Sequence, residues 1–371
     1  MRVLLFSSPG WGTLAIEQLV ANGHRVVGLC CRPPASPLRR LARPLRRSVR
    51  GWAGRSRTAW FYGEDPFADL MHPRRVARRL RIPWIDPKAL GSAKGVEVLQ
   101  RLRPEVAFVA GFPRRIPQDL AQVPPCGTIN FHPSLLPAHR GGTPTRWTIL
   151  RGERMTGVTA HLVTEALDAG DLLCAKTLEV GEDETWGSLE RRAASLAAAL
   201  LCELAAELAV GRRPAPVPQD QEAATYERPF RQADSVMDWA EPLELTMRRC
   251  RAAKPKWGGI FGLHGRPFCA WSVERAEAPG PPAAPGTITR VSPGRWLEVA
   301  CADGLLRITH LLSEAGDLVS VPRHVGDRAI LPGDRCEPST VVRRWVSPHG
   351  ELACAATSAD GHRATLAPAS R

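Results

Sequence analysis

The chain has 371 residues and a formal net charge of +13, from 50 Lys and Arg against 37 Asp and Glu. Its 44% hydrophobic and 23% charged residues are typical of a globular protein and exclude a wholly disordered, collagenous or simple coiled-coil chain. The length predicts two domains. The basic excess favours an anionic partner such as nucleic acid, a phosphorylated metabolite or a membrane surface. The alternative is that a GC-rich genome encodes many arginines and that the excess marks no partner.

Neither the amino terminus nor the cysteines indicate export, a membrane span or a metal site. The first apolar run is too short for the core of a signal peptide, and no apolar stretch approaches about 18 residues. Ten cysteines without any C-x-x-C pair are too sparse for a disulfide scaffold. We therefore expect a cytoplasmic, metal-free protein that does not bind membranes. The sequence does not indicate an oligomeric state.

Short apolar runs alternate with amphipathic segments through the first part of the chain. Strands are expected at residues 2–7, 25–31, 82–85, 106–110 and 128–131. Helical periodicity predicts helices between these strands, at residues 14–20, 67–81 and 88–103. This alternation predicts an α/β fold with a Rossmann-like open parallel sheet and right-handed crossovers.

An arginine-rich insertion follows the second predicted strand. Residues 32–58 contain nine arginines, and no acidic residue lies between Glu17 and Glu64. Four prolines in this stretch argue against one continuous helix. Such a loop either contacts phosphates or is a solvated segment whose charge serves no specific partner.

The second part of the chain has a different pattern. A long amphipathic helix is expected over 185–210, and the proline-rich stretch that follows it reads as a linker. Short strands divided by turns then predict a small OB-like β-barrel, at residues 259–263, 267–275, 286–291, 296–301 and 305–311. The expected organisation is an N-terminal domain, a linker, a barrel domain and a flexible tail, over residues 1–211, 212–230, 231–335 and 336–371.

Two polar side chains stand at the end of a predicted buried strand. Asn130 and His132 are two positions apart, so they point to the same side of the sheet, and Pro133 ends the strand. Open α/β sheets bind ligands at the carboxyl ends of their parallel strands. A carboxamide and an imidazole at that edge can donate to an oxygen that becomes negative during acyl transfer.

Asp168 lies in a second turn-rich stretch, Leu-Asp-Ala-Gly-Asp. A carboxylate close to His132 is expected to favour its imidazolium form and fix its tautomer, or to take up a proton from an attacking amine. Each of these residues taken alone is more typical of a structural turn or strand end. His161 is expected to face inward from a strand rather than to line a pocket.

The joint pattern resembles the formyltransferase family that uses 10-formyltetrahydrofolate, which includes methionyl-tRNA, glycinamide ribonucleotide and amino-sugar formyltransferases. The family pattern Asn-x-His-x-Ser-Leu-Leu-Pro-x-x-Arg-Gly stands here as Asn130, His132, Ser134, Leu135, Leu136, Pro137, Arg140 and Gly141. The later Leu-Asp-x-Gly-Asp stands as Leu167, Asp168, Gly170 and Asp171. The resemblance extends loosely over about the first 320 residues.

The resemblance implies that Asn130, His132 and Asp168 are the catalytic residues and that no metal takes part. It also implies that 10-formyltetrahydrofolate is the co-substrate and that the motif loop shapes its pocket, through Ser134, Leu135, Leu136, Pro137, Arg140 and Gly141. In tRNA-acting relatives a basic loop contacts the acceptor stem at the place of the insertion. The acceptor expected is therefore methionyl-tRNA, with four candidate contacts at Arg39, Arg40, Arg46 and Arg47.

Some features favour other acceptors or other functions. The first turn departs from the Gly-Thr-Pro of tRNA enzymes, and His161 is similar to the small-molecule branches, so an amino-sugar, nucleotide or amino-acid amine is the alternative acceptor. Gly10-Trp-Gly-Thr-Leu-Ala15 fits a dinucleotide fingerprint and would suggest an NAD(P)-linked oxidoreductase, but the acid expected after the second strand is missing. A non-enzymatic nucleic-acid binder would account for the charge but not for the catalytic residues.

Overall fold

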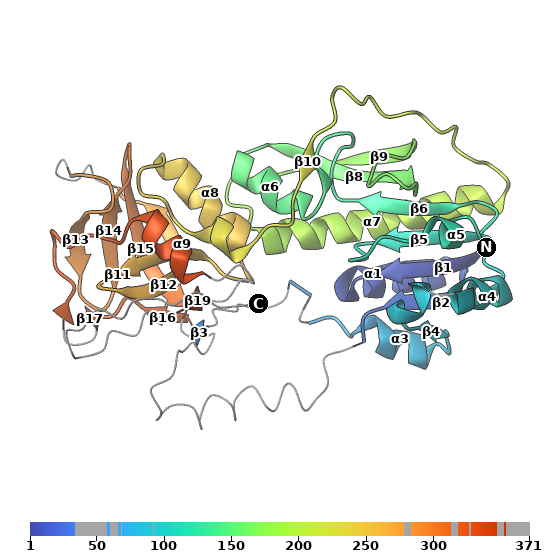
Figure 1. The fold of residues 1–371 in the computed structure, drawn as a ribbon, viewed down its shortest axis with the longest axis horizontal. Coiled ribbons are helices and arrows are strands. Elements are labelled where there is room, and N and C mark those ends of the chain that lie inside the picture. Colours follow the sequence, from blue (N-terminus) through green and yellow to red (C-terminus); the bar gives the residue numbers. More distant parts are fainter. Residues whose placement is uncertain are drawn as a thin grey trace, which may run out of the picture.

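The computed structural model describes residues 1–33, 58–59, 66–67, 69–91, 93–277, 283–312, 318–325, 328–346 and 352–353. Most of the arginine-rich insertion lies outside these residues, including Arg39, Arg40, Arg46 and Arg47. Figure 1 shows an α/β part built from the first half of the chain and a mostly β part built from the last third. An extended segment after the long helix α7 joins the two.

Seven strands in the described part of the chain form one mixed sheet in the order β4-β2-β1-β5-β6-β8-β9. The first five in this order are parallel, and β8 and β9 are antiparallel to their neighbours. The bounds are β1 Arg2–Ser7, β2 Arg25–Cys31, β4 Trp84–Ile85, β5 Val106–Ala110, β6 Thr128–His132, β8 Met155–Leu162 and β9 Leu172–Glu179. The Rossmann-like prediction is confirmed for the parallel strands, whose near-continuous apolar sequences suit a sheet covered on both faces.

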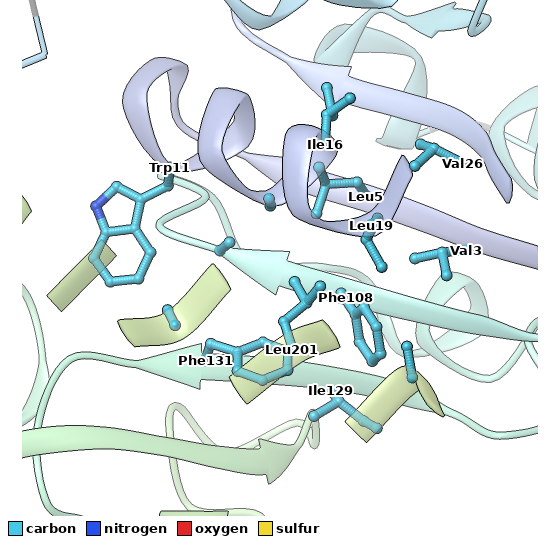
Figure 2. Close-up of a cluster of buried hydrophobic side chains, with 14 of the residues drawn as sticks. Val3, Leu5, Trp11, Ile16, Leu19, Val26, Phe108, Ile129, Phe131 and Leu201 are labelled. Atoms are coloured by element: carbon cyan, nitrogen blue, oxygen red, sulfur yellow. The ribbon is translucent and has the colours of Figure 1, made fainter. Parts of the chain in front are cut away.

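Helices cover both faces of this sheet. Helices α1, α3 and α7 pack on one face, and α4 and α5 lie on the other. The bounds are α1 Pro9–Ala21, α3 Pro73–Arg79, η2 Pro87–Gly91, α4 Ala93–Leu102, α5 Gln118–Ala121 and α7 Trp186–Ala209. Figure 2 shows the main core, where Leu201 of α7 faces Phe108 and Phe131 of the sheet, whose rings meet edge to face at 5.3 Å.

The glycines of the dinucleotide-like fingerprint serve packing at the start of α1. A Cβ on Gly10 would lie 2.0 Å from the Phe67 ring, and one on Gly12 would lie 2.1 Å from Ser7 Oγ. Both glycines are therefore required by close contacts within the protein. The pattern that suggested a dinucleotide site has a structural explanation here.

The C-terminal part is built on an antiparallel sheet in the order β11-β12-β15-β14-β13, with β16 paired to β15. The bounds are β11 Gly259–Leu263, β12 Arg266–Arg275, β13 Ile288–Ser292, β14 Trp296–Ala300, β15 Leu305–Leu312 and β16 Leu318–Ser320. The strands expected from the sequence are present, with shifts of one or two residues at their ends. The short elements are η3 Gln232–Ser235, β17 His324–Val325, β18 Arg328–Ala329 and the pair β3 Thr58–Ala59 with β19 Leu352–Ala353.

Besides the short α5, three α-helices in the described residues lie where the sequence suggested none. They are α6 Pro144–Arg151, α8 Leu243–Ala253 and α9 Ser339–Trp345. Helix α9 falls within the stretch predicted as a flexible tail, and its Val342 is fully buried against Val236 and Ile260. That apolar contact accounts for a helix at this position.

Helix α6 packs against α8, and this contact joins the two parts of the molecule. Arg146 of α6 is 2% exposed, and its guanidinium lies 3.6 Å from the ring centroid of Trp186 and 5.0 Å from that of Trp257. Its Nη1 donates to the carbonyl of Ala252 at 2.9 Å. Burial lowers the pKa of Arg146 to about 9, against the opposing effect of Glu190.

Among the residues that the structure describes, no group of three or more His, Cys, Asp and Glu side chains gathers as metal ligands would. In the same residues, no helix combines the length and apolar character needed to cross a bilayer.

Candidate active site

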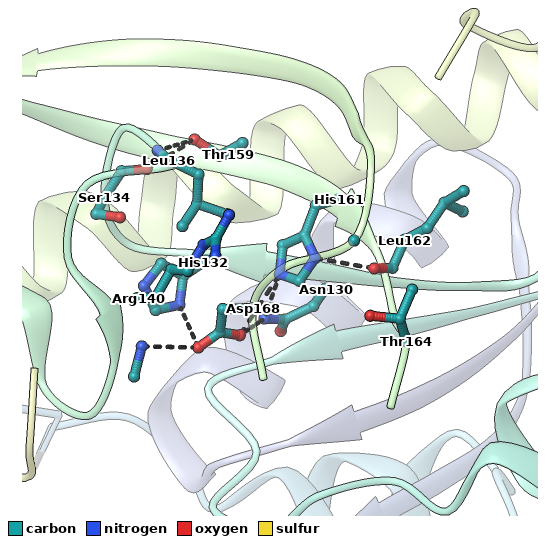
Figure 3. Close-up of polar contacts among 12 residues, drawn as sticks. Asn130, His132, Ser134, Leu136, Arg140, Thr159, His161, Leu162, Thr164 and Asp168 are labelled. Carbon is teal, nitrogen blue, oxygen red and sulfur yellow. Dashed lines mark hydrogen bonds and ion pairs between the residues drawn. The ribbon is translucent and has the colours of Figure 1, made fainter. Parts of the chain in front are cut away.

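The three residues singled out at the sheet edge lie together in the structure (Figure 3). Asn130 and His132 stand on β6, and Asp168 lies in the connection between β8 and β9. Strand β8 runs antiparallel to β6 and places His161 directly opposite Asn130. Strand β8 ends beside the amino-terminal part of β6, where Leu162 lies opposite Ile129, and the connection to β9 then folds back and brings Asp168 to Asn130 and His132.

Asp168 is the meeting point of the cluster. Its Oδ1 accepts from Asn130 Nδ2 at 3.2 Å, and its Oδ2 accepts from the Gly141 N–H at 2.9 Å. His161 Nε2 lies 3.5 Å from Oδ1, and His132 Nδ1 lies 3.7 Å from Oδ2. The carboxylate thus links two strands and the loop that follows β6.

The environment of Asp168 favours its charged form. Burial by itself would raise the pKa of this carboxyl, but the His161 and His132 rings and the Gly141 N–H outweigh it and lower the pKa to about 2. Asp168 is therefore a carboxylate throughout the neutral range. Its charge contributes to stability above the pKa of about 4 that an unfolded Asp has, and this contribution is lost as pH falls through the folded value.

His132 is held differently from the expectation. Its Nε2 lies 2.8 Å from the carbonyl oxygen of His139, which can only accept, so Nε2 carries the proton. In the neutral ring the lone pair is then on Nδ1, the atom that faces Asp168. The backbone carbonyl, and not Asp168, fixes the tautomer.

The charge of Asp168 does favour the imidazolium form of His132, but burial of the ring has the larger and opposite effect. Burial lowers the pKa of His132 below its usual 6.5, and this outweighs the opposing effects of Asp168 and the His139 carbonyl. His132 is 5% exposed, so the cost of burying a charge is large. The resting ring is neutral at neutral pH.

His161 belongs to the cluster, although the sequence favoured a purely structural position. Its side chain is 2% exposed, its Nδ1 donates to the Leu162 carbonyl at 3.0 Å, and its Nε2 accepts from Asn130 Nδ2 at 3.0 Å. It therefore orients the Asn130 amide. This role follows from the position of His161 opposite Asn130 in the pairing of β6 with β8. That pairing depends on the direction of β8, which the sequence pattern did not show.

Most of the predicted folate-binding loop is held by internal contacts. Ser134 Oγ donates to the Ala138 carbonyl at 2.7 Å, and Thr159 Oγ1 bridges the Ser134 carbonyl and the Leu136 N–H at 2.7 and 3.1 Å. Leu135 packs against Gly157, where a Cβ would lie 2.4 Å from its Cδ2. Ser134 is fully buried and Leu136 is 7% exposed. These contacts make the loop a rigid wall beside His132.

Arg140 points into the protein and away from any free surface. Its guanidinium is fully buried, and Nε and Nη2 donate to Gln219 Oε1 at 3.0 and 2.7 Å. Nη1 donates to Gln221 Oε1 at 3.0 Å and to the Tyr226 hydroxyl at 2.7 Å. The structure therefore gives Arg140 a role in holding the segment after α7.

Gln219 connects this segment to the Asp168 turn. Its Nε2 donates to the carbonyls of Asp168 and Gly170 at 2.9 and 2.7 Å, while its Oε1 accepts from Arg140. Asp168 has a φ of +51°, a conformation that non-glycine residues rarely adopt, and Gln219 helps to hold it. The role of Gln219 was not predicted, because a proline-rich segment has no periodicity from which contacts can be inferred.

Gly141 needs to be glycine for a geometric reason. Its φ is +100°, and strand β7 (Arg140–Gly141) lies parallel to β10 (Tyr226–Glu227). A Cβ at Gly141 would lie 2.3 Å from the carbonyl oxygen of Glu227. This close approach brings the Gly141 N–H to Asp168.

Comparison with known proteins identifies the family. The family model described as formyl transferase matches residues 50–204, and that of the formyl transferase C-terminal domain matches residues 229–324. A methionyl-tRNA formyltransferase of Roseiflexus castenholzii is 32% identical over 307 residues, which cover 82% of this chain and 89% of that protein. The chain belongs to the formyl transferase family. It is a formyltransferase, and the resemblance inferred from the sequence motifs is confirmed.

Solved structures share the fold of this formyltransferase at low identity. HypX from Aquifex aeolicus in complex with tetrahydrofolic acid is 17% identical with a TM-score of 0.55, covering 86% of this chain and 45% of HypX. An N-formyltransferase from Helicobacter canadensis, in complex with folinic acid and dTDP-3-aminofucose, is 13% identical with a TM-score of 0.56. That match covers 84% of this chain and all of the other.

Replacing Gly141 by alanine tests the close approach at Asp168. We expect Gly141→Ala to lower the free energy of unfolding by about 2–4 kcal/mol, from left-handed strain and the clash with Glu227, and to reduce formyl transfer. Gly211→Ala is the matched control, because Gly211 also has a positive φ, +78°, with nothing within 4 Å of a new Cβ. It should cost about 1 kcal/mol and leave turnover unchanged. Equal costs in denaturant unfolding would contradict this account of Gly141.

Proposed function

We propose that this formyltransferase moves the formyl group of 10-formyltetrahydrofolate to the amino group of methionyl-tRNA, in the cytoplasm. The observation that carries the proposal is the cluster of Asn130, His132 and Asp168 at the carboxyl end of β6. The name of the Roseiflexus relative supports the acceptor, and the folate compounds in the two similar structures support the co-substrate.

The neutral state of His132 suits it to accept a proton. When the acceptor amine attacks the formyl carbon, its nitrogen becomes positively charged and must lose a proton. Nδ1 of His132 carries a lone pair, and burial keeps the pKa of the ring low enough for the neutral form to predominate. We propose that Nδ1 takes this proton and returns it to the folate nitrogen as the carbon–nitrogen bond breaks.

Asn130 and Asp168 stabilise the charges that develop. The Nδ2 group of Asn130 can donate a hydrogen to the formyl oxygen as it becomes an oxyanion, in exchange for one of its present acceptors. The imidazolium of His132 would add a second donor. Asp168 is ionised and lies 3.7 Å from Nδ1, so it stabilises the imidazolium once the proton has moved.

The loop after β6 is proposed as the folate side of the site. Leu135, Leu136 and Pro137 would supply apolar surface, and Gly141 a close backbone approach. Ser134 and Arg140 would act indirectly, because internal hydrogen bonds occupy both side chains. No metal enters this proposal.

The proposed RNA acceptor agrees with the basic surface of the N-terminal part. Helix α3 and the turn after it expose five arginines, which are Arg74, Arg75, Arg78, Arg79 and Arg81. Guanidinium groups bind phosphate oxygens well. The proposed contacts at Arg39, Arg40, Arg46 and Arg47 would add to this charge.

A direct test of the acceptor is a formylation assay with defined amines. We expect purified protein and 10-formyltetrahydrofolate to formylate methionyl-tRNA, measured as tetrahydrofolate release and formylmethionine. Substituting Arg39, Arg40, Arg46 and Arg47 by Ser should raise KM for the tRNA and flatten its dependence on salt, since phosphate contacts release counterions. Turnover of a nucleotide-linked amino sugar without turnover of methionyl-tRNA would contradict the acceptor.

Substitution of the catalytic residues tests the site. His132→Asn and Asp168→Asn should each lower kcat about 100-fold or more, because each removes a group that handles the proton or its charge. His24→Asn is a control immediately before β2, at the amino ends of the parallel strands and away from the carboxyl end of β6, and should keep full activity. Wild-type kcat in a folded His132→Asn or Asp168→Asn protein would remove that residue from the proposed mechanism.

A further inference from the structure

His139 lies outside the catalytic trio, in the loop that follows β6, and its ring is held between two carboxylates. Its Nδ1 lies 3.1 Å from Glu227 Oε1, and its Nε2 lies 2.9 Å from both carboxylate oxygens of Glu153. The residue is 5% exposed. Each ring nitrogen of His139 therefore faces a carboxylate oxygen, and we call the His139, Glu153 and Glu227 side chains the clamp.

The clamp draws on different segments of the chain. Glu153 follows the end of α6, and Glu227 belongs to β10. Arg151, the last residue of α6, forms an ion pair with the same Glu227 oxygen that faces His139 and helps to orient that carboxylate. The position of His139 is therefore fixed by elements that are distant from it in the sequence.

The clamp holds an unusual backbone conformation. His139 has a φ of +57°, in the left-handed region that a residue with a Cβ rarely adopts. Its N–H donates to Thr225 Oγ1 at 2.8 Å. Such conformations persist where the surroundings over-determine them, and here the side chain and the N–H are both fixed.

The carbonyl of this same residue accepts the Nε2–H of His132 at 2.8 Å. The orientation of the His139 peptide thereby decides which nitrogen of His132 carries the proton. If the carbonyl turned away, the neutral ring could move its proton to Nδ1 and donate it to Asp168. A ring protonated at Nδ1 has no lone pair there for the proton of the attacking amine.

We propose that His139 is a positioning residue for formyl transfer. Its side chain, clamped by Glu153 and Glu227, fixes its backbone carbonyl, and the carbonyl keeps Nδ1 of His132 free to accept a proton. This inference rests on the proposed function of His132. It adds a residue that touches neither substrate but sets the protonation pattern of one that does.

His139→Asn separates the clamp from the backbone, because Asn tolerates a positive φ but is too short to span both carboxylates. We expect kcat to fall about tenfold, while KM for folate and acceptor stays within about twofold, since the proton step is weakened and binding is not.

His264→Asn is the matched control for this substitution. His264 also has a positive φ, +49°, and its buried side chain pairs with Asp334 at 3.0 Å, in the turn between β11 and β12. We expect a comparable loss of stability in thermal unfolding but an unchanged kcat. If His264→Asn lowered kcat as much as His139→Asn does, the effect would be one of general stability and the proposal would be overturned.

Variants of Glu227 give a second measurement that does not alter His139. Glu227→Gln keeps a hydrogen-bonding partner for Nδ1 of His139, whereas Glu227→Leu removes it. We expect Glu227→Gln to retain most of the wild-type kcat and Glu227→Leu to lose about tenfold. Equal kcat values for the two variants would overturn the clamp.

The result for His132→Asn distinguishes the two proposals. If His132→Asn is inactive and His139→Asn keeps the wild-type kcat, the positioning role fails and the proposed function stands. If His132→Asn is fully active, the role of His132 in the proposed function fails, and the positioning role fails with it.

Discussion

The carboxylate of Asp168 is the interaction on which the site depends. It accepts from Asn130 on β6 and from Gly141 in the loop after it, while the backbone carbonyl of the same residue accepts from Gln219. A buried carboxylate needs hydrogen-bond donors. Here the donors are Asn130 and the Gly141 N–H, so the same contacts that stabilise the charge also assemble the site. Burial alone would raise the pKa of Asp168, but the His161 and His132 rings and the Gly141 N–H lower it to about 2.

The segment after α7 is part of the site as well as a connection between the two parts of the molecule. Gln219 ties the Asp168 turn to Arg140, and Glu227 approaches both Gly141 and His139. Arg146, enclosed by aromatic rings, then joins α6 to the C-terminal part. The loop between β6 and α6 is therefore held by the segment after α7 and, through α6, by the C-terminal part.

The sequence predicted the parallel strands and placed Asn130 and His132 on one side of the sheet, because apolar runs and strand alternation are local properties. The place of Asp168 beside them was implied by the resemblance of the motifs to the family. The sequence did not predict that β8 runs antiparallel, since periodicity carries no strand direction, and so His161 was not placed beside Asn130. Helix α6 escaped prediction because Arg146, a charged residue, fills a buried position. The sequence did not predict the neutral form and the tautomer of His132, because burial of the ring and the His139 carbonyl decide them and neither is visible in the motif.

The most direct test of this account is the tautomer of His132, measured by long-range ¹⁵N–¹H correlation NMR on protein labelled with ¹⁵N-histidine. The His132→Asn spectrum assigns the signal. We expect a neutral ring with its proton on Nε2 at neutral pH, and a pKa of the ring below the usual value of 6.5 because of burial. A proton on Nδ1, or an imidazolium at neutral pH, would contradict it.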